Sequence, residues 1–96
     1  MTTGSIAARI QAKSGADLTM AAAANLALSQ GKTTFTRKEL TTEMRTATSY
    51  FKETYVSNFT ATLHTLTKEK KLNEPSNNTF ALTAAAEQEL RTKLAQ

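Results

Sequence analysis

The hydrophobic positions in the middle of the chain form two stripes at the spacing of an α-helix. The first stripe consists of Leu40, Met44, Ala47 and Phe51, and the second consists of Val56, Phe59, Leu63 and Leu66. At about 100° per residue, the second stripe is rotated by on the order of 120° from the first, so one straight helix cannot bury both. We therefore expect the chain to turn at 52–54, with Thr54 as the N-cap of a second helix over 54–70. Two helices joined in this way form a helix-turn-helix arrangement.

A capping-box motif marks the start of the first helix of this pair. Thr36 is followed three residues later by Glu39, so that each side chain can bond the backbone N–H of the other residue. Phe35 and Leu40 complete a hydrophobic staple across the same turn. We expect this helix to run over 37–51, preceded by a very short strand at 32–35.

An alanine-rich segment precedes the pair. It is expected to be a helix that begins after the N-cap Asp17 and ends at Gly31, because glycine suits the left-handed residue after a helix. Small side chains on nearly every side let a helix approach its neighbours closely, which predicts a place in the core or in a subunit interface. Before this helix, Ile6 and Ile10 lie at helical spacing, so residues 1–16 are either an extension or a short helix.

The last third of the chain changes from helical to strand-like spacing. The residues at 73–78 are a cluster of turn formers that contains the only proline, so the second helix of the pair ends before them. We expect a β-hairpin with strands at 71–74 and 79–83. Thr83 then caps a final helix over 84–94.

This order of elements resembles that of a winged helix-turn-helix domain. Residues 56–72, in which Leu63 and Leu66 precede a charged helix exit, resemble the recognition helix of winged-helix transcription regulators of the MarR and PadR type. These regulators usually carry glycine at that exit, where this chain has Lys70-Lys71. The segment that runs from Phe80 through Leu82-Thr83 into a helix resembles their second wing strand, and chromatin-associated winged-helix domains look comparably similar.

The resemblance covers about residues 17–94 and implies an α+β, mostly helical fold. Its parts are a three-helix core, a short β-hairpin wing and a C-terminal helix. We expect one winged-helix domain over 17–96.

If the second stripe faces the core, the opposite face of helix 54–70 is small, neutral and rich in hydrogen-bonding groups. It carries Ser57, Asn58, Ala61, His64, Thr65 and Lys68. In a major groove, Asn can pair with adenine, Ser and Thr can bond bases or phosphates, and a methyl group of Ala or Thr can meet that of thymine. The resemblance implies that this helix enters DNA. Otherwise the face is solvated and His64 is an ordinary surface histidine.

Basic residues flank this face, and the net charge of +4 suits an anionic partner. On the first helix of the pair, a basic rail is formed by Lys38, Arg45 and Lys52, which recur every seven residues and can hold phosphates, although Glu43 and Glu53 dilute its charge. The wing is approached by Lys70 and Lys71 and has Asn77 and Asn78 at its tip, where they contact DNA or only form the turn.

Composition argues against catalysis and against bound cofactors. A chain of 96 residues forms one modest core with shallow surface sites. With no Cys and one His, neither a disulfide framework nor a Cys–His zinc site is available, so we expect no metal and no cofactor. There is no apolar run long enough for a signal peptide or a membrane span, which predicts a cytoplasmic protein that does not contact membranes.

We therefore predict a small DNA-binding protein that regulates transcription. Helix 54–70 would lie in the major groove of double-stranded DNA and hairpin 71–83 would be the wing. We expect a homodimer, held by the alanine-rich helix or the terminal helix. The alternative is a winged-helix module for protein–protein interaction or assembly without DNA binding, which the weakly basic recognition face favours.

Overall fold

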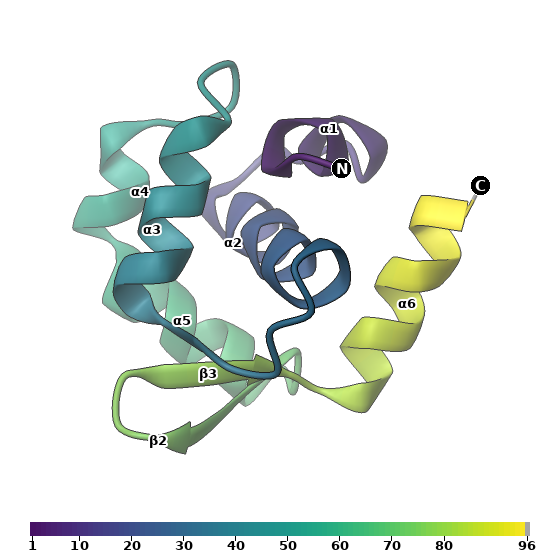
Figure 1. The fold of residues 1–96 in the computed structure, drawn as a ribbon. Coiled ribbons are helices and arrows are strands. Elements are labelled where there is room, and N and C mark those ends of the chain that lie inside the picture. The colour runs from purple at the N-terminus through teal and green to yellow at the C-terminus, as the bar shows by residue number, and fades with distance from the viewer. Residues whose placement is uncertain (96) are drawn as a thin grey trace.

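The computed structural model describes residues 1–95, and Figure 1 shows an α+β fold in which helices predominate. The mostly helical α+β class expected from the sequence is confirmed. Residue 96, the last of the expected domain, lies outside the described residues. Along the chain, the elements are α1 (Thr3–Arg9), α2 (Gly15–Ala24), the π-helix η1 (Asn25–Ser29), β1 (Phe35–Thr36), α3 (Arg37–Thr46), α4 (Glu53–Ser57), α5 (Phe59–Lys68), β2 (Leu72–Ser76), β3 (Thr79–Leu82) and α6 (Ala84–Ala95). Within residues 1–95, no helix combines the length and the apolar character that a bilayer crossing requires.

Helix α2 lies at the centre of the molecule, as expected for the alanine-rich segment (Figure 1). Its four consecutive alanines at 21–24 are completely buried. Because alanine extends little beyond the backbone, α1, α3, α5 and β3 can all pack against this one helix. Its small side chains are therefore covered within the chain.

The start of α2 differs from the prediction. The N-cap is Ser14, whose hydroxyl oxygen accepts a hydrogen bond from the backbone N–H of Asp17 at 3.1 Å. Asp17 is not the cap but lies in the first turn, where its carboxylate accepts from the N–H of Lys13 at 2.9 Å. The preceding segment is a helix and not an extension, because α1 has its own capping box at Thr2 and buries Ile6 completely.

The capping box at the start of α3 is confirmed. Thr36 Oγ1 accepts from the N–H of Glu39 at 3.1 Å, and Glu39 Oε1 accepts from the N–H of Thr36 at 2.9 Å. The second carboxylate oxygen of Glu39 is paired with the ammonium group of Lys32. This hydrogen bond from Lys32, together with that from the backbone of Thr36, lowers the pKa of Glu39 below its usual value.

Helix α3 ends at Thr46, five residues before the predicted end at 51. Ala47 leaves the helical conformation at φ −86° and ψ 66°, and its carbonyl accepts the N–H groups of both Tyr50 and Phe51. Thr and Ser at 48–49 favour this turn, because their hydroxyls compete for backbone partners and lower helix propensity. The turn between the helices therefore lies at 47–52 and not at 52–54.

The predicted helix over 54–70 is interrupted at Asn58, which separates α4 from α5. Thr54 is not an N-cap but lies inside α4, whose N-cap position is occupied by Lys52 without a side-chain hydrogen bond. Val56 is only half-buried and does not join the core, whereas the rest of the predicted stripe on α5 is buried. Within α4, the ring of Tyr55 packs on Gly15, where a Cβ would lie 3.0 Å from a ring carbon.

Helix α5 ends in a Schellman motif at the exit where the resembling family carries glycine. The N–H of Lys71 donates to the carbonyl of Leu66 at 2.9 Å, and that of Lys70 donates to Thr67 at 3.1 Å. Lys70 has a φ of +62°, in the left-handed region that favours glycine. The motif turns the chain sharply from α5 into the hairpin.

The hairpin is confirmed, but its strands are shifted and a third strand joins them. β2 runs over 72–76 instead of 71–74, and its register with β3 includes an irregularity between Asn73 and Ser76. β1 lies at 35–36 instead of 32–35 and pairs with β3, so that the strand order is β1-β3-β2. Phe35 lies opposite Phe80 in this antiparallel pair, and both side chains are buried. The sheet therefore ties the start of α3 to the hairpin.

We expect Phe59 and Leu63 to be essential for stability, because they are 1% and 3% exposed in the centre of the α5 interface. Truncation of either to Ala should lower the free energy of unfolding by about 2–5 kcal/mol. His64→Ala, an exposed change on the same helix, is the control and should cost less than about 0.5 kcal/mol. Urea unfolding measures both effects, and equal stability of all three variants would contradict the facing of α5.

The left-handed conformation at Lys70 predicts a stabilising substitution. Lys70→Gly should raise the free energy of unfolding by about 1 kcal/mol, because a residue with a Cβ pays roughly 1–2 kcal/mol in this region and glycine does not. Lys70→Ala is the matched control, since it removes the same charge and keeps the Cβ. Thermal unfolding should separate the two variants, and equal melting temperatures would argue against the motif.

Candidate nucleic-acid interface

The six residues predicted on the neutral face of the recognition helix are all exposed. Ser57 ends α4, Asn58 lies at the junction, and α5 carries Ala61, His64, Thr65 and Lys68. The face points away from the core because the buried residues of α5 lie on its opposite side. The expected face therefore exists, although the interruption at Asn58 divides it between two helices.

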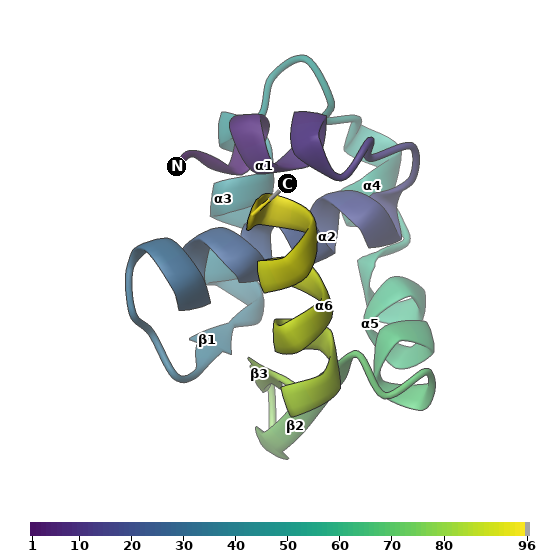
Figure 2. The same ribbon diagram turned by 90° about the vertical axis from the view of Figure 1, so that its right-hand side faces the viewer.

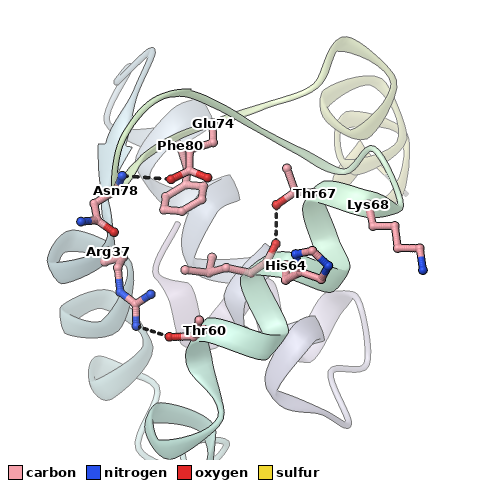
Figure 3. A pocket seen from close by; sticks show the side chains of 9 residues that line it. Arg37, Thr60, His64, Thr67, Lys68, Glu74, Asn78 and Phe80 are labelled. Atoms are coloured by element: carbon pink, nitrogen blue, oxygen red, sulfur yellow. Dashed lines mark hydrogen bonds between the residues drawn. The ribbon is translucent and has the colours of Figure 1, made fainter.

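A groove of about 470 Å³ lies between α5 and the hairpin (Figure 3). It is lined by residues from α3, α5, β2, β3 and the tip of the hairpin: Arg37, Thr60, Leu63, His64, Thr67, Lys68, Glu74, Asn78 and Phe80. The groove borders the neutral face, since His64 and Lys68 belong to both. It is the surface feature that joins the predicted recognition helix to the predicted wing.

Arg37 is the main residue of this groove that the sequence analysis missed. Its Nη2 donates to Thr60 Oγ1 at 3.0 Å, and its guanidinium lies 5.4 Å from the centre of the Phe59 ring. Its backbone N–H donates to the carbonyl of Asn78 at 3.3 Å. Arg37 is the first residue of α3, and no local sequence signal indicates its contact with a helix 22 positions later in the chain.

The predicted basic rail is not a continuous helix face. Lys38 and Arg45 are exposed on α3, but Lys52 lies beyond the end of this helix. Arg45 is also occupied, because its Nη1 lies 2.7 Å from Glu53 Oε1 and its guanidinium lies 4.9 Å from the centre of the Phe51 ring. Of the three residues, only Lys38 is exposed, belongs to α3 and has no ion pair among the described residues.

Glu43 does not dilute this rail as expected. It is half-buried, and its Oε1 accepts hydrogen bonds from Thr3 Oγ1 at 2.8 Å and from Asn25 Nδ2 at 2.6 Å. Glu43 thus joins α1 and η1 to α3. Its role is structural, because its carboxylate is engaged by these two side chains.

The four residues predicted around the wing are all exposed, but they differ in their ion pairs and hydrogen bonds. Lys70 and Lys71 are exposed, but Lys71 Nζ lies 3.8 Å from Glu69 Oε1. Asn77 and Asn78 form the exposed tip, and Asn78 has a φ of +60°. The N–H of Asn78 donates to Glu74 Oε2 at 3.0 Å, which orders the turn and brings a carboxylate to the groove. The asparagines therefore have a turn-forming role, and Glu74 is a site residue that sequence reasoning missed.

The arrangement offers two kinds of chemistry side by side. The neutral face can exchange hydrogen bonds and methyl contacts, and the lining of the groove includes the cations Arg37 and Lys68 and the carboxylate Glu74. Among residues 1–95, no three His, Cys, Asp or Glu side chains are grouped so that they could hold a metal ion. No protein-family model matches the chain, and neither does any curated protein or solved structure.

Proposed function

We propose that the chain is a winged helix-turn-helix protein that binds double-stranded DNA and regulates transcription, with α5 in the major groove and the β2–β3 hairpin as its wing. The proposal rests mainly on the difference between the buried side and the exposed side of α5. One side is anchored by Phe59, Leu63 and Leu66, and the other presents hydrogen-bonding side chains next to a groove with two cations. A rigidly held helix with a small polar face fits the major groove.

The sheet topology supports this proposal. In the proposed fold, α2, α3 and α5 are the three-helix core, and α4 is an additional turn between the second and third helices. The strand before α3 completes the sheet next to β3, in the order β1-β3-β2. Figure 2 shows the hairpin at one end of the molecule, so that its tip and the adjacent α5 can contact one ligand together.

The groove suits a phosphate backbone that passes between α5 and the wing. When a helix lies in the major groove, the sugar–phosphate strands border it, and Lys, Arg and hydroxyl groups are their usual partners. Arg37 and Lys68 supply the charge, Thr60 and Thr67 supply hydroxyls, and Lys38 extends the positive surface along α3. Glu74 limits how closely phosphates approach the wing side.

Homodimer formation through α6 is part of the proposal, since a single reading helix covers only one half-site. Of the two helices considered for self-association, α2 is covered by its own chain. α6 lies on the opposite side of α2 from α3 and α4 (Figure 1) and exposes most of its residues. A dimer through α6 leaves the recognition face free.

Binding of a protein partner by the same face is the second candidate function. It is favoured by the three glutamates that offset the nearby cations: Glu53 at Arg45, Glu69 at Lys71 and Glu74 in the groove. A mixed-charge surface of this kind is common at protein interfaces, and the fold alone does not decide between the two.

Phosphate binding by the groove predicts that Arg37→Met weakens binding to every duplex. The salt slope of the binding constant should fall by about one unit, because the variant neutralises one phosphate fewer. Met keeps much of the apolar stem that packs on Phe59. Lys13→Met, between α1 and α2, removes one positive charge outside the groove and outside α6, and it is the control, expected to change the slope little. Fluorescence anisotropy at several salt concentrations measures both, and equal slopes for the two variants would contradict the proposed backbone path.

Base contact by the neutral face predicts a different response. Asn58→Ala should lower the binding free energy for the preferred site by about 1–3 kcal/mol and leave non-specific binding nearly unchanged, because a base contact provides discrimination between sequences and little charge.

Lys68→Ala should weaken binding to all duplexes alike. Arg45→Met should weaken it less, since Arg45 is paired with Glu53. If no duplex binds at about 50 mM salt, where phosphate contacts are strong, the protein-binding alternative replaces the proposal.

A further inference from the structure

We infer that α5 recognises A·T-rich DNA through the C5-methyl groups of thymine. This inference rests on the proposed function and names the class of duplex that the same face selects. Its basis is the juxtaposition of Ala61 and Thr65, which lie one helical turn apart on the exposed side of α5. Two methyl groups at this spacing form an apolar strip on a face that is otherwise polar.

The arrangement of threonines on α5 singles out Thr65. Thr62 and Thr67 are half-buried, and their hydroxyls bond to the carbonyls of Asn58 and Leu63 in the preceding turn. Within the described part of the chain, Thr65 is exposed and makes no such bond. Its methyl and hydroxyl groups are both available to a ligand.

The absence of cations from this stretch of sequence argues against guanine. Residues 53–67 contain neither Lys nor Arg, which are the commonest partners of guanine O6 and N7. The guanidinium of Arg37, which contacts α5, is bound there to Thr60 and lies over the Phe59 ring. Lys68, the last residue of α5, lines the groove that is assigned to the phosphate backbone.

The remaining polar groups are compatible with A·T pairs. Asn58 precedes the first turn of α5, and the amide of Asn is the usual bidentate partner of adenine N6 and N7. His64 can donate one N–H to N7, an atom that adenine and guanine share, so this hydrogen bond does not favour guanine. The methyl strip then distinguishes thymine from cytosine, which lacks a C5-methyl group.

A base-analogue experiment tests the methyl recognition directly. Anisotropy titrations compare an A·T-rich duplex with the same duplex in which deoxyuridine replaces thymidine, and a G·C-rich duplex with its 5-methylcytosine counterpart. We expect the A·T-rich duplex to bind most tightly. Each thymine methyl group that packs against α5 should strengthen binding about fourfold relative to uracil, the equivalent of one buried methylene-sized group. 5-Methylcytosine should strengthen binding to the G·C-rich duplex.

Variants of Thr65 separate the methyl group from the hydroxyl. Thr65→Ser removes the methyl and keeps the hydroxyl, so it should abolish the share of thymine-over-uracil preference that Thr65 provides. Thr65→Val keeps a methyl and removes the hydroxyl, so it should retain the preference. Thr46→Ser makes the same change at the end of α3, outside the groove and outside α6, and should have no effect. Thermal unfolding of each variant establishes that it is folded.

The outcomes distinguish the inference from the proposed function. Equal binding of the thymine and uracil duplexes, with the salt-dependent affinity intact, overturns methyl recognition and leaves the proposal of DNA binding standing. Loss of the preference in Thr65→Val with its retention in Thr65→Ser also overturns it, because the hydroxyl would then be the group that binds. Failure to bind any duplex at about 50 mM salt overturns the proposed function, and the inference with it.

Discussion

Close packing around the alanines of α2 is the interaction on which the rest of the structure depends. Four completely buried alanines allow α1, α3, α5 and β3 to approach the same short helix. Tightly packed interiors tolerate added volume poorly, so a larger side chain at Ala22 or Ala23 would have to displace a whole element. Because these side chains are small, α3 and α5 can lie close to α2, and their positions define the groove.

The second constraint is the pairing of β1 with β3, which sets one wall of the groove. Phe35 opposite Phe80 joins segments that lie far apart in the chain, and the capping box at Thr36 then starts α3 at the edge of the sheet. Arg37 is brought next to Asn78 and Thr60 as a consequence. A site residue is thus positioned by a strand of only two residues.

The distribution of charge around α5 bears on how it would bind. Arg45 and Lys71 have carboxylate neighbours, and Glu74 lies in the groove itself. Exposed ion pairs of this kind contribute little to stability, but they reduce the positive potential that an approaching polyanion meets. In the proposed complex with DNA, affinity would then depend more on contacts of the neutral face than on charge. The same mixture of charges is the observation that favours the proposed protein-binding alternative.

Local interactions were predictable from the sequence by itself. The capping box at Thr36, the burial of the alanine-rich helix, the hairpin, and the core side of Phe59 and Leu63 all follow from hydrogen bonds or periodicity within a few residues. The exposed polar side of α5 was predicted for the same reason.

Tertiary structure decided where the helices end and which elements lie beside them. The break at Asn58 accompanies the packing of Tyr55 on Gly15, and the groove requires Arg37, α5 and the hairpin to meet. Such interactions join segments that are distant in the chain. Their energy depends on how whole elements pack, and a short stretch of sequence carries no information about that packing.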